Sequence, residues 1–160
     1  MNKTLYHGSN IVISHPIVSL GRTNLDFGQG FYLTDIQEQA DRWARRVAAL
    51  RKSKVITNIY SFNFQKVKDR YKYLKFEEYD ESWLDFIVAN RQGKNKAAYY
   101  DIIEGGVAND RVIDSIEAYM AGMMPKEICL QNLSMHQPNN QICILNQEII
   151  DQYLKFIKSY

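Results

Sequence analysis

Hydrophobic and polar residues follow two different periods along this chain. Short runs rich in β-branched and aromatic residues predict strands. They cover residues 4–7, 31–33, 55–64, 99–103 and 141–145. Longer stretches repeat apolar residues at helical spacing and therefore predict helices. These helices begin near residues 35, 80, 109, 125 and 148, and the last one is expected to extend to Phe156.

The strongest helical pattern follows residue 35. Thr34 or Asp35 is expected to cap this helix, with Gln37 or Glu38 completing a capping box. Its apolar face comprises Ala40, Trp43, Ala44, Val47 and Leu50, and its polar face carries Arg42, Arg45, Arg46 and Arg51. This pattern places Trp43 in the core, and Trp83 is expected to be a core anchor of the same kind.

The mixture of these elements indicates an α+β fold in one domain. No internal repeat, low-complexity tract or Pro/Gly/Ser-rich linker divides the chain. A chain of 160 residues with 46% hydrophobic content lies within the usual range for one domain with one core. We therefore expect a single domain spanning residues 1–160.

Charge and cysteine content indicate a cellular compartment but do not identify a binding partner. The 20 basic and 18 acidic residues leave a net charge of +2, which gives no electrostatic argument for a nucleic-acid or membrane surface. Cys129 and Cys143 lack the spacing of a zinc or redox motif and are expected to be small buried side chains. No signal peptide or membrane-spanning run is present, so a cytoplasmic protein is expected.

Two glycine-containing segments hold the residues best suited to bind a ligand. His7-Gly8-Ser9 combines an imidazole, a glycine that permits close backbone approach and a hydroxyl at the end of a predicted strand. Phe27-Gly28-Gln29-Gly30-Phe31-Tyr32 places two glycines before another strand. It is not the dinucleotide fingerprint of a Rossmann fold, because that motif joins a strand to a helix. Taken singly, each segment also fits a structural role, as a core histidine and a tight turn.

Together, the two segments resemble the opening motifs of the diphtheria-toxin and poly(ADP-ribose) polymerase branch of ADP-ribosyltransferases. That branch pairs a His-Gly-Ser or His-Gly-Thr strand with a Phe-Gly-x-Gly-Ile-Tyr-Phe segment, and the matching residues here are 5–9 and 27–35. The whole chain is also similar to a family of small bacterial proteins of unknown function, through residues 23–28, 83–86, 107–111 and 141–143. The resemblance implies an ADP-ribosyltransferase-like fold, with a split antiparallel β-sheet core and flanking helices, and NAD as co-substrate without a metal.

The resemblance also implies a role for each matching residue. His7 would hydrogen-bond ribose hydroxyls of NAD, and the backbone of Gly8, helped by Ser9, would hold the nicotinamide carboxamide. Tyr32 would stack on the nicotinamide ring. Phe31 and Arg111 complete the expected NAD-binding set, with Arg111 directed to the pyrophosphate because a guanidinium fork suits phosphate oxygens.

The third catalytic position departs from the family pattern. The branch usually supplies a glutamate at the start of a late strand, and the matching residue here is Gln141. A glutamine carbonyl can accept a hydrogen bond from a ribose hydroxyl, but it carries no charge and cannot act as a general base. The predicted catalytic set is therefore His7, Tyr32 and Gln141, and polymer formation is not expected.

Other polar residues fit structural roles better than catalysis. Asp101, Asp110 and Glu148 are expected to be helix caps or solvated acids. Arg22 is a second, weaker candidate for the NAD pyrophosphate. His15 and His136 flank prolines in expected loops, and their spacing does not indicate a metal site.

The leading hypothesis is mono-ADP-ribosyl transfer from NAD to a macromolecule. The family resemblance suggests a bacterial toxin or effector, with an antitoxin or immunity protein as a further partner. The neutral Gln141 supports a second hypothesis, a module that binds NAD or ADP-ribose without turnover. NAD hydrolysis is a third, and a structural or protein-interaction domain is a fourth, which leaves the coincidence of the two motifs unexplained.

Overall fold

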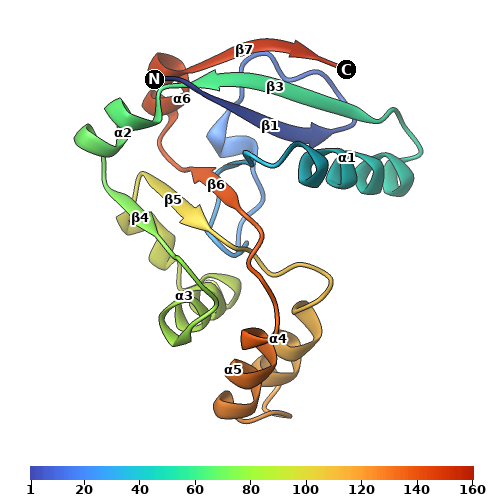
Figure 1. Ribbon diagram of the computed structural model, residues 1–160, viewed down its shortest axis with the longest axis vertical. Helices are drawn as coiled ribbons and strands as arrows, with labels where there is room; N and C mark the ends of the chain where they lie inside the picture. Colours follow the sequence, from blue (N-terminus) through green and yellow to red (C-terminus); the bar gives the residue numbers. More distant parts are fainter.

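The computed structural model describes all 160 residues as a mixed α+β fold with six α-helices and two β-sheets (Figure 1). Sheet A has the strand order β1 (Lys3–Ser9), β3 (Ile56–Phe62) and β7 (Leu154–Ser159), and all its pairs are antiparallel. Sheet B has the order β2 (Phe31–Leu33), β6 (Gln141–Ile144), β5 (Ile102–Gly105) and β4 (Tyr73–Lys75). Its β4–β5 pair is parallel, so the expectation of purely antiparallel strands is wrong at this edge.

The two sheets meet at one point. Tyr6 of β1 and Thr34, just after β2, form an isolated antiparallel bridge with N–H to carbonyl distances of 2.8 and 3.0 Å. Beyond this bridge the edges of β1 and β2 separate. The end of β1, which carries His7 to Ser9, therefore lies along an open edge beside sheet B.

One helix covers sheet A, and a helical pair extends beyond sheet B. Helix α1 (Gln37–Arg51) packs on β1 through the buried stripe Ala40, Ala44 and Ala48. Helices α4 (Ile113–Met120) and α5 (Lys126–Ser134) are inserted between β5 and β6 and project away from both sheets in Figure 1. The remaining helices are α2 (Phe64–Arg70), α3 (Glu81–Arg91) and α6 (Gln147–Tyr153), with short 3-10 helices at Val18–Leu20 and Lys96–Tyr99.

Sheet B separates two hydrophobic clusters. Because side chains alternate along a strand, Ile142 and Ile144 of β6 face one cluster while Cys143 faces the other. The first cluster includes Leu5, Tyr60 and Phe62 from sheet A, and the second is built around Trp83 with residues of α3, α4 and α5. Cys129 and Cys143 are free and buried, as expected.

Most of the predicted elements are confirmed. Strands β1, β2 and β6 lie where the alternation places them, and α3 begins after Asp80, whose carboxylate caps Trp83 N–H at 2.9 Å. The strand expected at 99–103 lies slightly later, because residues up to Tyr99 form a 3-10 helix. Gly122 follows α4 with a φ of 75°, a conformation that favours glycine after a helix.

Other predictions are wrong for identifiable reasons. The last helix ends at Tyr153, and β7 follows, because Leu154 and Phe156 pair with Phe62 and Tyr60 of β3. The apolar residues of α6 and β7 together follow a helical spacing, and this pattern therefore predicted one continuous helix. Short elements α2 and β4 were not predicted, and Phe64 begins α2 instead of ending the preceding strand.

The cap and the face of α1 also differ from the prediction. Ile36 is the N-cap residue and no side chain caps it; Thr34 Oγ1 instead accepts a bond from Ile36 N–H at 3.1 Å, within the turn before the helix. Trp43 is 48% exposed, so it is not a core anchor. Only alanines fit against β1 because the helix approaches the strand so closely, which turns the larger side chains outward. No helix is both long and apolar enough to cross a membrane.

Candidate functional site

His7 links the two sheets through its imidazole. Its Nδ1 lies 2.6 Å from the carbonyl oxygen of Tyr32, and its ring stacks on Phe31 with centroids 4.3 Å apart. A carbonyl only accepts hydrogen bonds, so Nδ1 carries the proton and a neutral ring leaves Nε2 as an acceptor. Burial lowers the pKa of His7, and the bond to the Tyr32 backbone only partly opposes this shift. The neutral form is therefore favoured.

His7 Nε2 has no partner within the chain. The structure contains no fully buried, unpaired side-chain nitrogen or oxygen, so Nε2 reaches the surface of the site. Phe31 is itself buried, packed between His7 and the edge of the Tyr60 ring, and it supports the imidazole from one side. The site therefore presents a fixed hydrogen-bond acceptor at Nε2.

Gly8 presents its backbone to the open edge of β1. The N–H and C=O of Tyr6 point to Thr34, and strand alternation directs those of Gly8 to the same side. Thr57, its partner on β3, directs its own N–H and C=O to Tyr160, just after β7, instead. A Cβ on Gly8 would lie 2.1 Å from the carbonyl oxygen of Ala40, so only glycine allows α1 to pack here. A donor and an acceptor therefore face the gap between the sheets.

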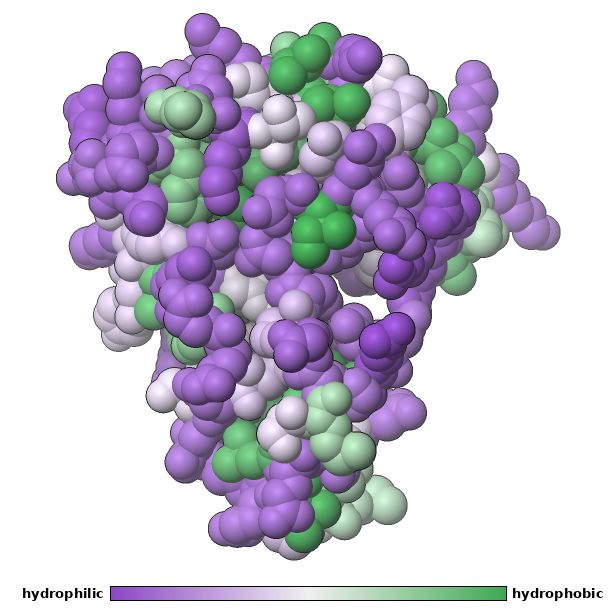
Figure 2. Space-filling model, in the orientation of Figure 1, coloured by the Kyte–Doolittle hydropathy of each residue, from purple (hydrophilic) through white to green (hydrophobic).

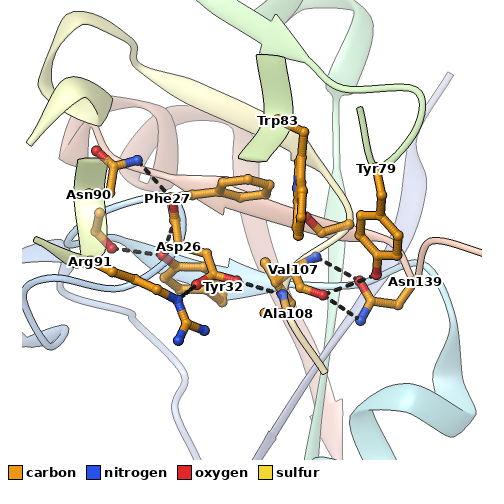
Figure 3. A network of polar contacts seen from close by, with 12 residues as sticks. Asp26, Phe27, Tyr32, Tyr79, Trp83, Asn90, Arg91, Val107, Ala108 and Asn139 are labelled. Atoms are coloured by element: carbon orange, nitrogen blue, oxygen red, sulfur yellow. Dashed lines mark hydrogen bonds and ion pairs between the residues drawn. The ribbon is translucent and has the colours of Figure 1, made fainter. Parts of the chain in front are cut away.

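Tyr32 holds the glycine-rich segment in place (Figure 3). Its hydroxyl donates to Gly28 C=O at 2.7 Å and accepts from Phe27 N–H at 3.1 Å. Gly28 has a φ of 81°, which favours glycine. Burial raises the pKa of Tyr32 well above its usual value, so the hydroxyl stays protonated and keeps donating. The half-buried ring is thus held by two hydrogen bonds at its hydroxyl end.

Gln141 begins β6 on the same side of the sheet as Tyr32. Tyr32 pairs with Cys143 and Leu33 with Ile142, so the register continues to Thr34 beside Gln141. Its side chain is half-buried and makes no hydrogen bond within the chain. The structure therefore brings His7, Gly8, Tyr32 and Gln141 to the junction around the Tyr6–Thr34 bridge.

The start of β6 is fixed by residues that sequence reasoning missed. Asn140 Nδ2 donates to Asp35 at 2.8 Å and to Glu104 at 3.3 Å. Gln39 of α1 bonds both the carbonyl and the N–H of Asn140, at 3.1 and 3.4 Å. Glu104 is buried and also accepts from the Tyr73 hydroxyl. A glutamate within the apolar run of β5 was the signal that could have identified this network.

Asp26 joins two segments that lie far apart in the sequence (Figure 3). Its buried carboxylate accepts from Ala108 N–H at 2.6 Å and pairs with Arg91 of α3. Val107 and Asn139 exchange two bonds of 2.8 and 3.1 Å, which holds together the segments entering and leaving the α4–α5 insertion. These contacts connect the segment before the glycines with the segment that leads into Gln141.

The remaining expected site residues do not join this group. Arg111 is exposed, and its backbone N–H donates to Asn109 Oδ1. Arg22 is also exposed and makes no ion pair. Asp110 pairs with Arg46 of α1 at 2.6 Å. Ser9 Oγ accepts from Ile11 N–H at 3.4 Å and shapes the turn after β1.

Asp101 and Glu148 have structural roles. Asp101 accepts from Lys72 N–H at 2.9 Å and from Asn146 at 3.2 Å. Glu148 accepts from the Tyr71 hydroxyl at 2.9 Å. No group of three or more His, Cys, Asp or Glu side chains is placed to hold a metal ion.

One side of helix α1 faces the α4–α5 insertion. Gln39 contacts Asn140 and Arg46 contacts Asp110, so the side of α1 that includes position 43 faces the segments of the insertion. Trp43 lies on this side, with the Arg46 guanidinium 5.7 Å from its ring centre. An exposed aromatic ring therefore borders the junction.

Comparison with known proteins gives one match. No curated protein and no solved structure matches this chain. Residues 3–156 match the family described as "Protein of unknown function (DUF3990)", and the chain therefore belongs to the DUF3990 family.

Proposed function

We propose that this chain is a mono-ADP-ribosyltransferase that binds NAD at the junction of sheets A and B. One observation carries the proposal. His7 and Tyr32, which come from the two segments that resemble ADP-ribosyltransferase motifs, meet across the junction with a 2.6 Å hydrogen bond. A core of two sheets that separate beside this bond also fits the split sheet of an ADP-ribosyltransferase-like fold.

Gly8 suits the carboxamide of nicotinamide. The carboxamide carries one carbonyl acceptor and one amide donor, which complement a backbone N–H and C=O pointing to the same side. Buried backbone groups are almost always paired, so an unpaired donor and acceptor together favour a ligand. Two such bonds would fix the rotation of the carboxamide relative to the ribose.

His7 and Tyr32 supply the remaining contacts. Nε2 of a neutral His7 accepts a hydrogen bond from a ribose hydroxyl, and Nδ1 keeps the ring oriented through Tyr32. The Tyr32 ring offers a flat face for the nicotinamide, held in position by its bonds to Gly28 and Phe27. These residues orient NAD, and holding a substrate in its reactive geometry is one contribution to catalysis.

Gln141 limits how fast the bond can break. The bond between the nicotinamide nitrogen and ribose C1′ breaks, nicotinamide leaves with the electron pair, and an acceptor nucleophile bonds to C1′ and releases its proton to solvent. Positive charge develops on the ribose, and a neutral amide stabilises it less than a carboxylate. We expect turnover to be slow and limited to single units.

The neutral Gln141 also supports a second candidate function. Without a charged group near the ribose, the same contacts would make a module that binds NAD or ADP-ribose with little turnover. Hydrolysis of NAD, with water as the nucleophile, is intermediate between transfer to a macromolecule and binding without turnover. A role as a bacterial toxin or effector with an inhibitory partner follows only from the family resemblance.

Release of nicotinamide from NAD by the purified protein tests the proposal. His7→Ala and Tyr32→Ala are expected to reduce release at least tenfold, whereas His136→Ala is the matched control outside the site. Labelled NAD added to cell lysate should label a specific acceptor through the same residues. NAD binding without release supports the module, release without acceptor label supports hydrolysis, and absence of binding overturns all three.

A further inference from the structure

The guanidinium group of Arg91 uses only part of its hydrogen-bonding capacity. Arg91 is the last residue of α3, and its Nε donates to Asp26 Oδ1, while Asp26 Oδ2 accepts from Ala108 N–H. An arginine that only neutralised this carboxylate would place two parallel bonds on its two oxygens. Instead, the two terminal nitrogens of Arg91 bond to no other residue, and Figure 3 shows them pointing away from Asp26. The N–H groups at this end of the side chain are therefore available to a ligand.

These free N–H groups are held in a fixed position. The Arg91 side chain is mostly buried, and the Asp26 carboxylate that it contacts is buried as well. Asn90, the residue before Arg91, donates to the Asp26 carbonyl at 2.8 Å and accepts from Ala97 N–H at 3.0 Å. A donor that is already ordered loses little conformational entropy when a ligand binds to it.

Arg91 lies close to the ring on which nicotinamide is proposed to stack. Phe27 N–H, one residue after Asp26, donates to the Tyr32 hydroxyl at 3.1 Å. Burial is the main cause of the raised pKa of Tyr32, and the Asp26 carboxylate is near enough to raise it further. Figure 3 shows the Arg91 guanidinium beside Asp26 and Tyr32. A ligand stacked on the ring can therefore extend past the Tyr32 hydroxyl to the free end of Arg91.

The surface leaves room for such a ligand beside the junction. In Figure 2 it is hollowed between α1 and the segment that follows β5, and hydrophilic side chains border this hollow. The ion pair between Arg46 and Asp110 connects the same two parts of the chain. Ala108, whose N–H is bonded to Asp26, lies two residues before Asp110. One short segment therefore joins the hollow to the contacts of Arg91.

The charges around Arg91 favour a phosphate group. Arg22 is exposed and makes no ion pair, and its loop contacts the turn after α3, where Asn24 Oδ1 is 3.8 Å from the position of a Cβ on Gly93. Asp26 is the only acidic residue in these two loops, and both of its oxygens are already bonded. A guanidinium group matches two oxygens of a phosphate group, and a second cation nearby adds to the attraction for an anion.

We infer that the free end of the Arg91 guanidinium binds the pyrophosphate of NAD. The inference rests on the proposed function for the identity of the ligand, whereas the oxyanion site itself does not depend on it. NAD bound through its nicotinamide at Gly8 and Tyr32 carries its pyrophosphate beyond the first ribose, where a fixed cation stabilises it. Arg111, expected from the sequence to have this role, is exposed and makes no ion pair. Arg91 is fixed by its contact with Asp26.

Arg91→Lys separates phosphate binding from folding. Lysine keeps a positive charge for Asp26, but its single ammonium group does not provide a second pair of fixed donors. Isothermal titration calorimetry should show a loss of about tenfold or more in affinity for NAD, because hydrogen bonds between charged groups are strong. Affinity for nicotinamide riboside, which has no phosphate, should change less than about twofold. Urea unfolding should show a stability close to that of the unchanged protein.

Two controls accompany this variant. Arg51→Lys changes an exposed arginine of α1 that makes no ion pair, and it should leave the affinity for both ligands unchanged. Inorganic pyrophosphate, tested on the unchanged protein, should compete with NAD but not with nicotinamide riboside. This competition does not depend on the folding of any variant.

Equal losses of affinity for NAD and nicotinamide riboside would show that Arg91 only shapes the site, and they would overturn the inference. No competition by pyrophosphate would overturn it as well. Release of nicotinamide together with an NAD affinity that Arg91→Lys leaves unchanged overturns this inference alone. NAD binding that depends on Arg91 without release overturns the proposed function alone. Pyrophosphate binding through Arg91 without any NAD binding assigns the site to another phosphate ligand and overturns both.

Discussion

His7 is a half-buried histidine whose protonation would remove the hydrogen-bond acceptor at Nε2. Burial lowers its pKa below the usual 6.5, so the unfolded chain binds this proton more readily than the folded chain. Stability is therefore complete above pH 6.5 and falls as the pH drops below it, by at most about 1.4 kcal/mol per pH unit. We expect His7→Gln to have a shallower loss of unfolding free energy between pH 6.5 and 5 than the unchanged protein.

Urea unfolding at several pH values measures this difference. His136→Gln removes a histidine that makes no side-chain hydrogen bond in the chain and should leave the slope unchanged. If His7→Gln and the unchanged protein lose stability in parallel, the neutral state of His7 is not what the fold requires.

Gln141 stands where the proposed chemistry would be better served by a charged side chain. The register puts it beside Thr34, next to Tyr32 on the same side of sheet B, with its amide free of bonds. Gln141→Glu introduces the charge that a developing positive ribose would attract, and we expect nicotinamide release to rise about tenfold or more, since charged hydrogen bonds are about twice as strong. Single-turnover kinetics with NAD measure the change, and Gln131→Glu on α5 controls for added charge. A folded variant that binds NAD and shows no change would contradict the alignment.

The buried Asp26–Arg91 pair holds three elements together. The Asp26 carboxylate also accepts from Ala108 N–H, and the Arg91 side chain is only 23% exposed. Arg91→Met leaves a buried carboxylate without its cation, and we expect a loss of about 3 kcal/mol of unfolding free energy. Asp26→Asn with Arg91→Met should lose less than the sum of the single changes, because neither charge is then left unpaired.

Chemical denaturation of the two single variants and the double variant gives this coupling energy. Additive losses would mean that the pair is open enough to be solvated. Lys126→Met, which breaks a more exposed pair with Glu81 and Asp85, is the comparison and should cost much less than Arg91→Met.

At the scale of elements, alternation and helical spacing predict most segments, including the three-residue strand β2, but miss two short ones. Strands β1 and β6 and helix α3 were identified because their patterns persist over several residues. Helix α2 and strand β4 are too short for a period to emerge. The exposure of Trp43 depends on how closely α1 approaches Gly8, which is a tertiary contact and leaves no trace in the local pattern.

At the scale of the whole molecule, the candidate site depends on contacts between distant segments. The motifs of His7 and Tyr32 were identifiable only as a pair, through their joint resemblance to a known family, because each alone also fits a structural role. The Asn140, Glu104 and Gln39 network was not identified. Only Glu104, a charged residue in an apolar run, stands out in its own segment, and its partners become apparent only when β5, β6 and α1 come together.

The junction of two sheets also predicts how a ligand should affect the whole fold. His7 and Gly8 belong to sheet A, while Tyr32 and Gln141 belong to sheet B, so NAD bound among them would connect the two halves. A ligand at 100 times its dissociation constant adds about 2.7 kcal/mol of stability. For a chain of this size that corresponds to a rise of about 5–10 °C in melting temperature. Differential scanning fluorimetry with NAD should show this rise, and His7→Ala should abolish it while His136→Ala keeps it. An equal rise with ADP-ribose would show that the nicotinamide contacts at Gly8 contribute nothing, and no rise at millimolar NAD would exclude the junction as its site.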